Sequence, residues 1–137
     1  MGGFQRAKER EAMVVASSES SPYLTVISNG TVVSRADTTR DKGGHESGFR
    51  PHELLEAAFA ACMNIHLRMY SDNHGLRLES VRTTASLDRS EPPKAVFKYS
   101  IELTGELTND QRNKLLQIAE TCPVHNTLLR EIGFQYR

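Results

Sequence analysis

Hydrophobic positions along this chain follow two different spacings. Residues 76–88 and 95–103 alternate between apolar and polar with the period of two typical of strands, and residues 12–17, 22–28 and 31–35 are short runs rich in β-forming residues. Spacings of three and four, typical of helices, begin at residues 51, 108 and 123. The order is three strands, a helix, two strands and two helices, with room for a last strand. It predicts an α+β fold with antiparallel sheets rather than a doubly wound parallel one.

Two connections join the predicted strands into hairpins. Asn29-Gly30 lies between the second and third strands, and this pair favours a type I′ turn, in which both central residues have positive φ. The segment EPPK, residues 91–94, separates the last two strands. In the first strand of that second pair, the alternation slips between Leu78 and Val81, which predicts a β-bulge.

The long helix is predicted to begin at Pro51, because proline suits the first helical position. Asn73 or Gly75 ends it. Its expected buried stripe is Leu55, Ala58, Cys62, Ile65 and Met69.

Two further helices are predicted near the C-terminus. Thr108 and Gln111 form a capping box that starts the first of them, and the second runs from Pro123 to near Gly133. The expected buried stripe of the first comprises Leu115, Leu116, Ile118 and Ala119.

Segments outside these elements are polar. Residues 1–11 are charged and lack an apolar period, so a loose N-terminal tail is expected there. Residues 36–50 form a glycine-bearing loop, and a long loop in a small protein is often functional. Residues 12–137 have the length of a single domain.

Charge and composition narrow the classes of function. Seventeen basic and seventeen acidic residues cancel, which argues against binding to nucleic acid or to anionic membranes. No apolar stretch is long enough to span a bilayer, and the first residues lack the apolar middle of a secretory signal. A cytoplasmic protein is expected. In that reducing compartment two cysteines favour catalytic or redox use over a structural disulfide.

The chain's two cysteines, Cys62 and Cys122, would react as thiolates. Cys122 precedes Pro123 and therefore takes a helix N-cap position, where free N–H groups and the helix dipole favour an anion. Cys62 lies well inside the long helix and cannot use that effect, so it needs a nearby cation. The candidates are Arg68 and three arginines that flank or lie within the polar loop, Arg35, Arg40 and Arg50.

The same two thiols also have interpretations that involve no catalysis or redox chemistry. Either cysteine would serve as a small buried apolar residue without reactivity. Cys122 and His125 have the Cys-Xaa-Xaa-His spacing that metals use, but two ligands do not make a closed zinc site. No metal and no other cofactor is therefore expected.

Two motifs resemble the OsmC/Ohr family of thiol-dependent hydroperoxide reductases, and in particular its OsmC-like branch. They are FRPHELLEAAFAACMNIHLRMYSDNHG at residues 49–75 and GELTNDQRNKLLQIAETCPVHNTL at residues 105–128. The glycine-bearing loop before the first motif also fits the family. The resemblance covers about residues 22–132, and the joint spacing of Pro51, Cys62 and the CPVH segment is specific to it.

The resemblance implies an intertwined homodimer in which antiparallel sheets wrap the long central helices, with active sites at the dimer interface. Cys62 falls on the family's peroxidatic cysteine, which becomes a sulfenic acid, and Cys122 falls on the cysteine that resolves it. The implied substrates are organic hydroperoxides. The implied reductants are small dithiols or lipoylated proteins, in an antioxidant stress response.

The sequence departs from the family at one supporting position. Relatives carry a glutamate directly after the proline, and it pairs with an arginine that holds the thiolate. Here His52 stands in that place and Glu53 follows, and one residue turns a helical side chain by about 100°. Protonated His52 would be a replacement partner for the thiolate. Arg40 and Arg50 are the candidates for the arginine.

This departure keeps two other functions open. One is a non-catalytic OsmC-like protein that binds a hydrophobic small molecule in the dimer cleft. The other is a thiol redox sensor, in which oxidation to a stable disulfide alters a partner surface without turnover.

Overall fold

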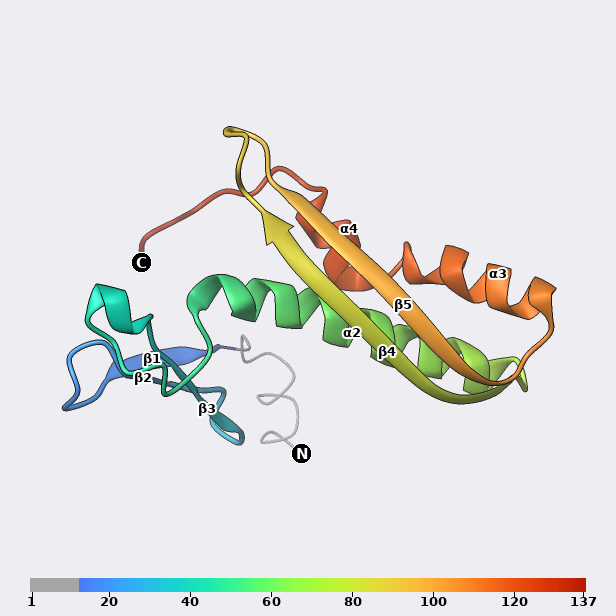
Figure 1. Cartoon of the computed structure of the whole chain (residues 1–137), viewed down its shortest axis with the longest axis horizontal. Helices are drawn as coiled ribbons and strands as arrows, with labels where there is room; N and C mark the ends of the chain where they lie inside the picture. Colours follow the sequence, from blue (N-terminus) through green and yellow to red (C-terminus); the bar gives the residue numbers. More distant parts are fainter. Residues whose placement is uncertain (1–12) are drawn as a thin grey trace, which may run out of the picture. The chain divides into compact units, whose positions relative to one another are not determined.

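The computed structural model describes residues 13–137, so the predicted tail at residues 1–11 lies outside the described part of the chain. The chain divides into two compact units, with the boundary between Pro51 and His52. Figure 1 shows the elements of each unit. A single folding domain over residues 12–137 stays a prediction.

The first unit is a small antiparallel sheet followed by a loop. Its strands are β1 (Val15–Ser18), β2 (Thr25–Ser28) and β3 (Val33–Ala36), in the order β1-β2-β3. The three predicted strands are confirmed, although each is shorter than its sequence pattern. A single 3-10 turn, η1 (Arg40–Lys42), lies in the loop that follows.

The hairpin at Asn29-Gly30 is confirmed, but the predicted type I′ turn is wrong. Ser28 pairs with Val33, so four residues connect the strands. Gly30 has a φ of 95°, whereas Asn29 does not have positive φ. Its side-chain oxygen instead accepts hydrogen bonds from the N–H groups of Thr31 and Val32, at 3.0 and 2.8 Å. This side-chain turn competes with the backbone turn that the residue pair favours.

The polar loop after β3 is organised around the buried carboxylate of Asp37. This carboxylate accepts hydrogen bonds from the backbone N–H groups of Ser47 at 3.0 Å, Thr38 at 2.7 Å and His45 at 3.2 Å. These bonds, with that from Ser47 contributing most, hold the pKa of Asp37 below its usual range. The loop is therefore a folded structure even though its sequence has no apolar period.

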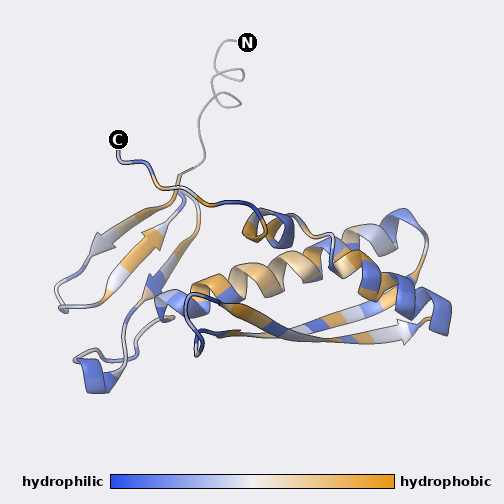
Figure 2. Ribbon diagram, turned by 90° about the horizontal axis from the view of Figure 1, so that it is seen from above, coloured by the Kyte–Doolittle hydropathy of each residue, from blue (hydrophilic) through white to orange (hydrophobic). Residues whose placement is uncertain are grey.

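The second unit contains a long helix, a two-stranded hairpin and two shorter helices. Both views show the helix running along the hairpin (Figures 1 and 2). The elements in chain order are α2 (Pro51–Asn73), β4 (Arg77–Asp88), β5 (Val96–Glu106), α3 (Asn109–Ala119) and α4 (Pro123–Leu128).

The predicted β-bulge lies near the start of β4. Leu78 pairs with Gly105 and Ser80 pairs with Thr104, so Glu79 is the extra residue. Gly105 has a φ of 142°, and a Cβ there would lie 2.2 Å from the carbonyl oxygen of Arg77. Glycine is therefore required opposite the bulge.

The core of the second unit covers one face of α2, but not the predicted face. Phe59, Met63 and Leu67 of α2 are almost completely buried. They form one cluster with Leu78, Leu115, Ala119 and Cys122.

The stripe predicted to be buried on α2 is largely exposed. Leu55, Ile65 and Met69 are 46%, 57% and 59% exposed, and Ala58 is exposed as well. The prediction was wrong because α2 carries two apolar stripes with the same spacing, and periodicity alone does not say which one the rest of the chain covers. On α3, Leu115 and Ala119 are buried as predicted, but Leu116 is 43% exposed.

The ends of the short helices are confirmed in part. Thr108 and Gln111 form the predicted capping box of α3. Helix α4 ends at Leu128 rather than near Gly133, and no strand follows within the described residues. The apolar side chains that suggested a longer helix, such as Leu129 and Ile132, are 75% and 54% exposed. A helical turn there would bury no apolar face to stabilise it.

Candidate functional site

Helices α2 and α4 bring the two cysteines together. Cys62 lies in the middle of α2 and is partly exposed, whereas Cys122 is completely buried as the N-cap residue of α4. Cys62 packs against the core cluster that contains Cys122, and both thiols are free. The N-cap position predicted for Cys122 is confirmed. The pairing was not visible in the sequence, because sixty residues separate the two positions.

The first turn of α4 donates a backbone N–H group to each sulfur. The N–H of Val124 donates to Cys62 Sγ at 3.5 Å, and that of His125 donates to Cys122 Sγ at 3.4 Å. The prediction that Cys62 cannot use a helix N-terminus was therefore wrong. It considered only the helix that contains Cys62, whereas the donor comes from another helix. Such donors stabilise a thiolate relative to a thiol.

The predicted preference of Cys122 for the anionic form is also wrong. Burial raises the pKa of the Cys122 thiol, and the neighbouring Cys62 raises it further. The N–H groups of His125 and Val124 lower it, but they do not compensate. Cys122 is therefore a neutral thiol near pH 7, and a weak nucleophile while it remains neutral.

A second contact between α2 and the α3–α4 connection lies one helical turn from Cys62. His66 Nε2 is 2.9 Å from the hydroxyl oxygen of Thr121. That hydroxyl donates a hydrogen bond to the carbonyl of Ile118 at 2.7 Å, so it accepts from the imidazole. This contact fixes the residue directly before Cys122.

Arg68 does not serve as the cation for Cys62. Its guanidinium donates to the carbonyl oxygens of Leu78 and Glu79 at 2.7 and 3.0 Å. It also pairs with Asp72 at 3.6 Å. These contacts direct Arg68 to β4 and to the end of α2.

The other predicted supporting residues are not brought to Cys62 within the second unit. Arg35, Arg40 and Arg50 belong to the first unit, in which Arg40 pairs with Glu46 at 3.1 Å. The exposed His52 and half-buried Glu53 lie in the first turn of α2. The helix rises about 15 Å from His52 to Cys62, which is too far for contact along one chain.

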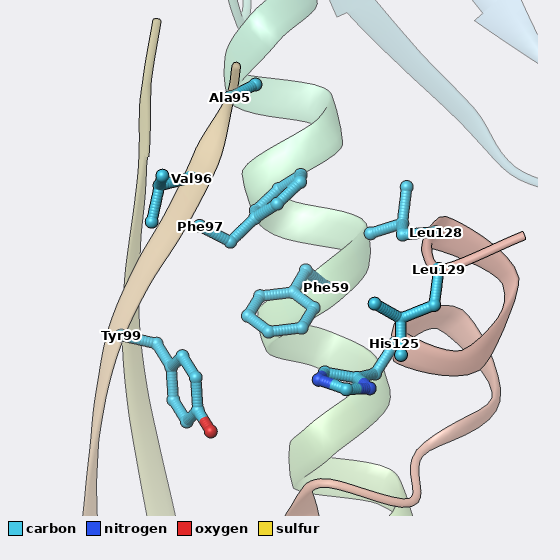
Figure 3. A pocket seen from close by; sticks show the side chains of 8 residues that line it. All are labelled: Phe59, Ala95, Val96, Phe97, Tyr99, His125, Leu128 and Leu129. Carbon is cyan, nitrogen blue, oxygen red and sulfur yellow. The ribbon is translucent and has the colours of Figure 1, made fainter. Parts of the chain in front are cut away.

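A pocket of about 360 Å³ lies beside the thiols and was not predicted from the sequence. Its lining side chains come from α2, β5 and the α4 region (Figure 3) and are Phe59, Ala95, Val96, Phe97, Tyr99, His125, Leu128 and Leu129. One signal of this pocket is present in the sequence, because the period of two puts Phe97 and Tyr99 on the same face of β5. For His125, the spacing to Cys122 indicates only a possible metal ligand.

Aromatic contacts centre the pocket on Phe59. Its ring centroid is 5.0 Å from that of Phe97, 5.4 Å from that of Tyr99 and 6.0 Å from the stacked imidazole of His125. Burial raises the pKa of Tyr99, with further contributions from Glu120 and Cys122. Its hydroxyl therefore stays protonated at neutral pH and can donate a hydrogen bond.

Residues 13–137 contain neither a cluster of metal ligands nor a membrane-spanning helix. No group of three or more histidine, cysteine, aspartate or glutamate side chains is placed to hold a metal ion in this part of the chain. In the same residues, no helix has both the length and the apolar character needed to cross a membrane.

Comparisons with known proteins agree with this arrangement of helices and strands. Residues 44–137 match the family model described as OsmC-like protein. Peroxiredoxin OsmC of Escherichia coli strain K12 is 31% identical over 105 residues, which cover 72% of each protein.

Two solved structures share the fold. An OsmC-like protein from Mycoplasma pneumoniae has a TM-score of 0.73 at 15% identity, covering 88% of each chain. An organic hydroperoxide resistance protein OsmC from Legionella pneumophila has a TM-score of 0.62 at 21% identity, covering 88% of this chain and 90% of that one. The match to the family model and to the Escherichia coli protein shows that this chain belongs to the OsmC-like protein family.

Proposed function

We propose that this protein is a thiol-dependent peroxidase that reduces organic hydroperoxides. One observation carries the proposal: the first turn of α4 brings both thiols together by donating one backbone N–H group to each sulfur, from Val124 to Cys62 and from His125 to Cys122. The relatives named Peroxiredoxin OsmC and organic hydroperoxide resistance protein support it at the level of the family.

Cys62 is the residue that reacts with the peroxide. It is the more accessible of the two thiols, and it receives the N–H of Val124. Its thiolate attacks the outer oxygen of the hydroperoxide, an S–O bond forms and the O–O bond breaks. The leaving alkoxide takes up a proton and departs as an alcohol, while the sulfur is oxidised to a sulfenic acid.

Cys122 then resolves the sulfenic acid. Its sulfur attacks Cys62, an S–S bond forms, and the hydroxyl leaves with the Cys122 proton as water. The negative charge on Cys62 contributes to the raised pKa of Cys122. Oxidation of Cys62 removes that charge and so favours ionisation of Cys122 at the stage when a thiolate is needed.

A dithiol completes the cycle by thiol–disulfide exchange. A small dithiol or a lipoylated protein reduces the Cys62–Cys122 disulfide and is itself oxidised to a disulfide. We place the protein in the cytoplasm, where the reducing environment regenerates free thiols.

Exposed apolar side chains support a homodimer. Leu55, Ile65 and Met69 lie on α2 at the spacing by which paired helices pack, and each is about half exposed. Cys62 belongs to the same stripe, so pairing two copies through α2 would place it at the interface. Phe134 and Tyr136 are almost completely exposed in a single chain and would also gain from a partner.

A second copy would also bring supporting residues toward Cys62. His52 and Glu53 are too far from Cys62 along their own helix. In an antiparallel pair of α2 helices, however, these residues of one copy can lie beside Cys62 of the other. Arg40 or Arg50 would supply the guanidinium. The site is therefore proposed to be complete only in the dimer.

Stopped-flow consumption of cumene hydroperoxide with dithiothreitol or dihydrolipoamide tests the proposal. Cys62→Ser is expected to lose at least a hundredfold in rate, because it removes the nucleophile. Cys122→Ser is expected to keep a first fast reaction and to lose formation of the intramolecular disulfide. If wild type and Cys62→Ser are equally inert, the protein is not a peroxidase. Formation of a stable disulfide without turnover would instead indicate the redox sensor.

A non-catalytic binder of hydrophobic small molecules is the second candidate. The pocket favours it, because the lining is mostly apolar and includes neither cysteine. The rate of alkylation of Cys62 as a function of pH, measured in Cys122→Ser, separates the two functions. Rapid alkylation at neutral pH supports the peroxidase, and alkylation only at alkaline pH supports the binder.

A further inference from the structure

Thr121, the residue directly before Cys122, is held by hydrogen bonds from several directions. Its hydroxyl donates to the carbonyl oxygen of Ile118 at 2.7 Å and accepts from His66 Nε2 at 2.9 Å. Its backbone N–H donates to the same carbonyl oxygen at 2.9 Å, and its own carbonyl oxygen accepts from the side-chain amide of Asn126 at 3.4 Å. Ile118 and Asn126 belong to α3 and α4, so among these bonds the one from His66 ties Thr121 to α2.

This bond to α2 matters because Cys62 precedes His66 by four positions, so the two side chains are neighbours on one side of the helix. The hydrogen bond therefore holds the residue before Cys122 against the turn that carries the reacting sulfur. Cys122 is completely buried, whereas Thr121 is exposed and His66 is half-buried. The hydrogen bond can therefore be removed by substitution without opening the core.

We infer that His66 is a positioning residue for attack by Cys122, and that its hydrogen bond to Thr121 protects Cys62 from irreversible oxidation. The inference rests on the proposed peroxidase function and concerns what becomes of its sulfenic acid. His66 acts through Thr121 on the placement of the Cys122 sulfur and has no part in the attack on the peroxide.

The sulfenic acid of Cys62 can react in two competing ways. In the first, the Cys122 sulfur attacks Cys62, an S–S bond forms, the S–O bond breaks and water leaves. In the second, the sulfur of the ionised sulfenic acid attacks the outer oxygen of another hydroperoxide molecule. A second S–O bond forms, the O–O bond breaks, and the alkoxide takes up a proton and leaves as an alcohol. The sulfur is then a sulfinic acid, which thiols do not reduce.

Placement of Cys122 decides between these two reactions. Burial raises the pKa of the Cys122 thiol, so it is neutral near pH 7 and attacks slowly. A weak nucleophile that is held in place reacts faster than a mobile one, because less orientational freedom has to be lost in the transition state. The bond between His66 and Thr121 therefore favours the disulfide over the sulfinic acid.

His66→Phe keeps a ring at this position and removes both nitrogen atoms. After one equivalent of cumene hydroperoxide, we expect its intramolecular disulfide to form about fivefold more slowly than in wild type, the loss that corresponds to one ordinary hydrogen bond. During turnover with excess peroxide and dithiothreitol, the fraction of Cys62 converted to sulfinic acid per cycle should rise about fivefold, measured by mass spectrometry. An unchanged rate of disulfide formation would overturn the inference, and so would an equal loss in the rate of the first reaction with peroxide.

A double-mutant cycle assigns the effect to the hydrogen bond itself. Thr121→Val removes the hydroxyl at nearly constant volume and should slow disulfide formation by at least as much as His66→Phe. Adding His66→Phe to Thr121→Val should then cost nothing further, and Thr121→Ser, which keeps the hydroxyl, should behave as wild type. Additive losses in the double variant would overturn the inference.

His74→Phe is the matched control on the same helix. The imidazole of His74 stacks on Tyr70, with ring centroids 3.9 Å apart, and its Nδ1 is 2.8 Å from the Tyr70 carbonyl oxygen. This variant should form the disulfide and resist formation of the sulfinic acid as wild type does. Slowing as large as that of His66→Phe would show a general effect of changing α2 and would overturn the inference.

Equilibration with reduced and oxidised glutathione separates this inference from the proposed function, because it needs no peroxide. If wild type consumes no hydroperoxide, the peroxidase proposal fails, but the effective concentration of the two thiols can still be measured. His66→Phe should lower it about fivefold, which raises the reduction potential of the disulfide by about 20 mV. Equal potentials for wild type and His66→Phe would overturn the inference whatever the activity, and so would the absence of any Cys62–Cys122 disulfide in wild type.

Discussion

Helix α2 carries two apolar stripes with the same spacing and opposite surroundings. Phe59, Met63 and Leu67 are buried against the hairpin and the short helices, whereas Leu55, Ile65 and Met69 are about half exposed. Each stripe is associated with one thiol. Cys122 packs in the cluster that covers the first stripe, and Cys62 lies within the second.

The buried stripe stabilises a single chain, whereas the exposed stripe is available for contact with a second chain. The buried stripe gains its stability from contacts within the second unit. Leu55, Ile65 and Met69 of the exposed stripe do not belong to that core cluster, and the same stripe contains the more accessible thiol, Cys62. The fold of one chain therefore depends on the first stripe, and the proposed assembly and chemistry depend on the second.

The largest effect on stability is expected from a change in the buried stripe. Met63 is completely buried, so Met63→Ala removes apolar contacts and leaves a cavity. We expect a loss of about 2–5 kcal/mol in the free energy of unfolding, measured with urea. A loss as small as that of Ile65→Ala, the matched change on the exposed stripe, would contradict the assignment of the core.

A charge on the exposed stripe should act on assembly instead. Ile65→Lys would place an unpaired ammonium group in the proposed interface, and we expect the dissociation constant of the dimer to rise at least a hundredfold, about 2.7 kcal/mol. Sedimentation equilibrium measures it. Urea unfolding of the dissociated variant should stay close to that of the wild-type monomer. A wild-type protein that is monomeric at high concentration would remove the proposed role of this stripe.

The smallest expected effect is a dependence of stability on pH at Cys122. Because burial raises the pKa of this thiol in the folded state, the unfolded chain loses its proton first as pH rises. The stabilisation is complete below the ordinary thiol pKa of about 8.5 and is lost as pH rises from there through the folded-state pKa, by at most about tenfold in the unfolding constant per pH unit.

Urea unfolding of the reduced protein between pH 7 and 10 checks this effect. The matched variant Cys122→Ala lacks the titrating group and should show a weaker decrease over the same range. Equal slopes for the two proteins would mean that Cys122 titrates as a free thiol.

Much of the second unit could be predicted because its signals are local. Pro51 at a helix start, the Thr108–Gln111 capping box and the slipped alternation after Leu78 each depend on a few neighbouring residues, and each is confirmed. The position of Cys122 at an N-cap is local in the same sense, because it follows from Pro123.

The predictions that were wrong concern features that depend on residues distant in the sequence. Which stripe of α2 is buried depends on the hairpin and on α3. The N–H donor to Cys62 comes from Val124, and the raised pKa of Cys122 depends on burial that no spacing reveals. The family resemblance identified both thiols as a pair, but it did not indicate the pocket or His125.

The connection between α3 and α4 is attached to a single turn of α2 at two points. Cys62 and His66 are one turn apart on that helix, and they contact Val124 and Thr121 on either side of Cys122. This rigid turn of α2 therefore sets the distance between the two sulfur atoms. An insertion between Cys122 and Pro123 would shift one attachment against the other, and disulfide formation would then fail even with every reacting atom present.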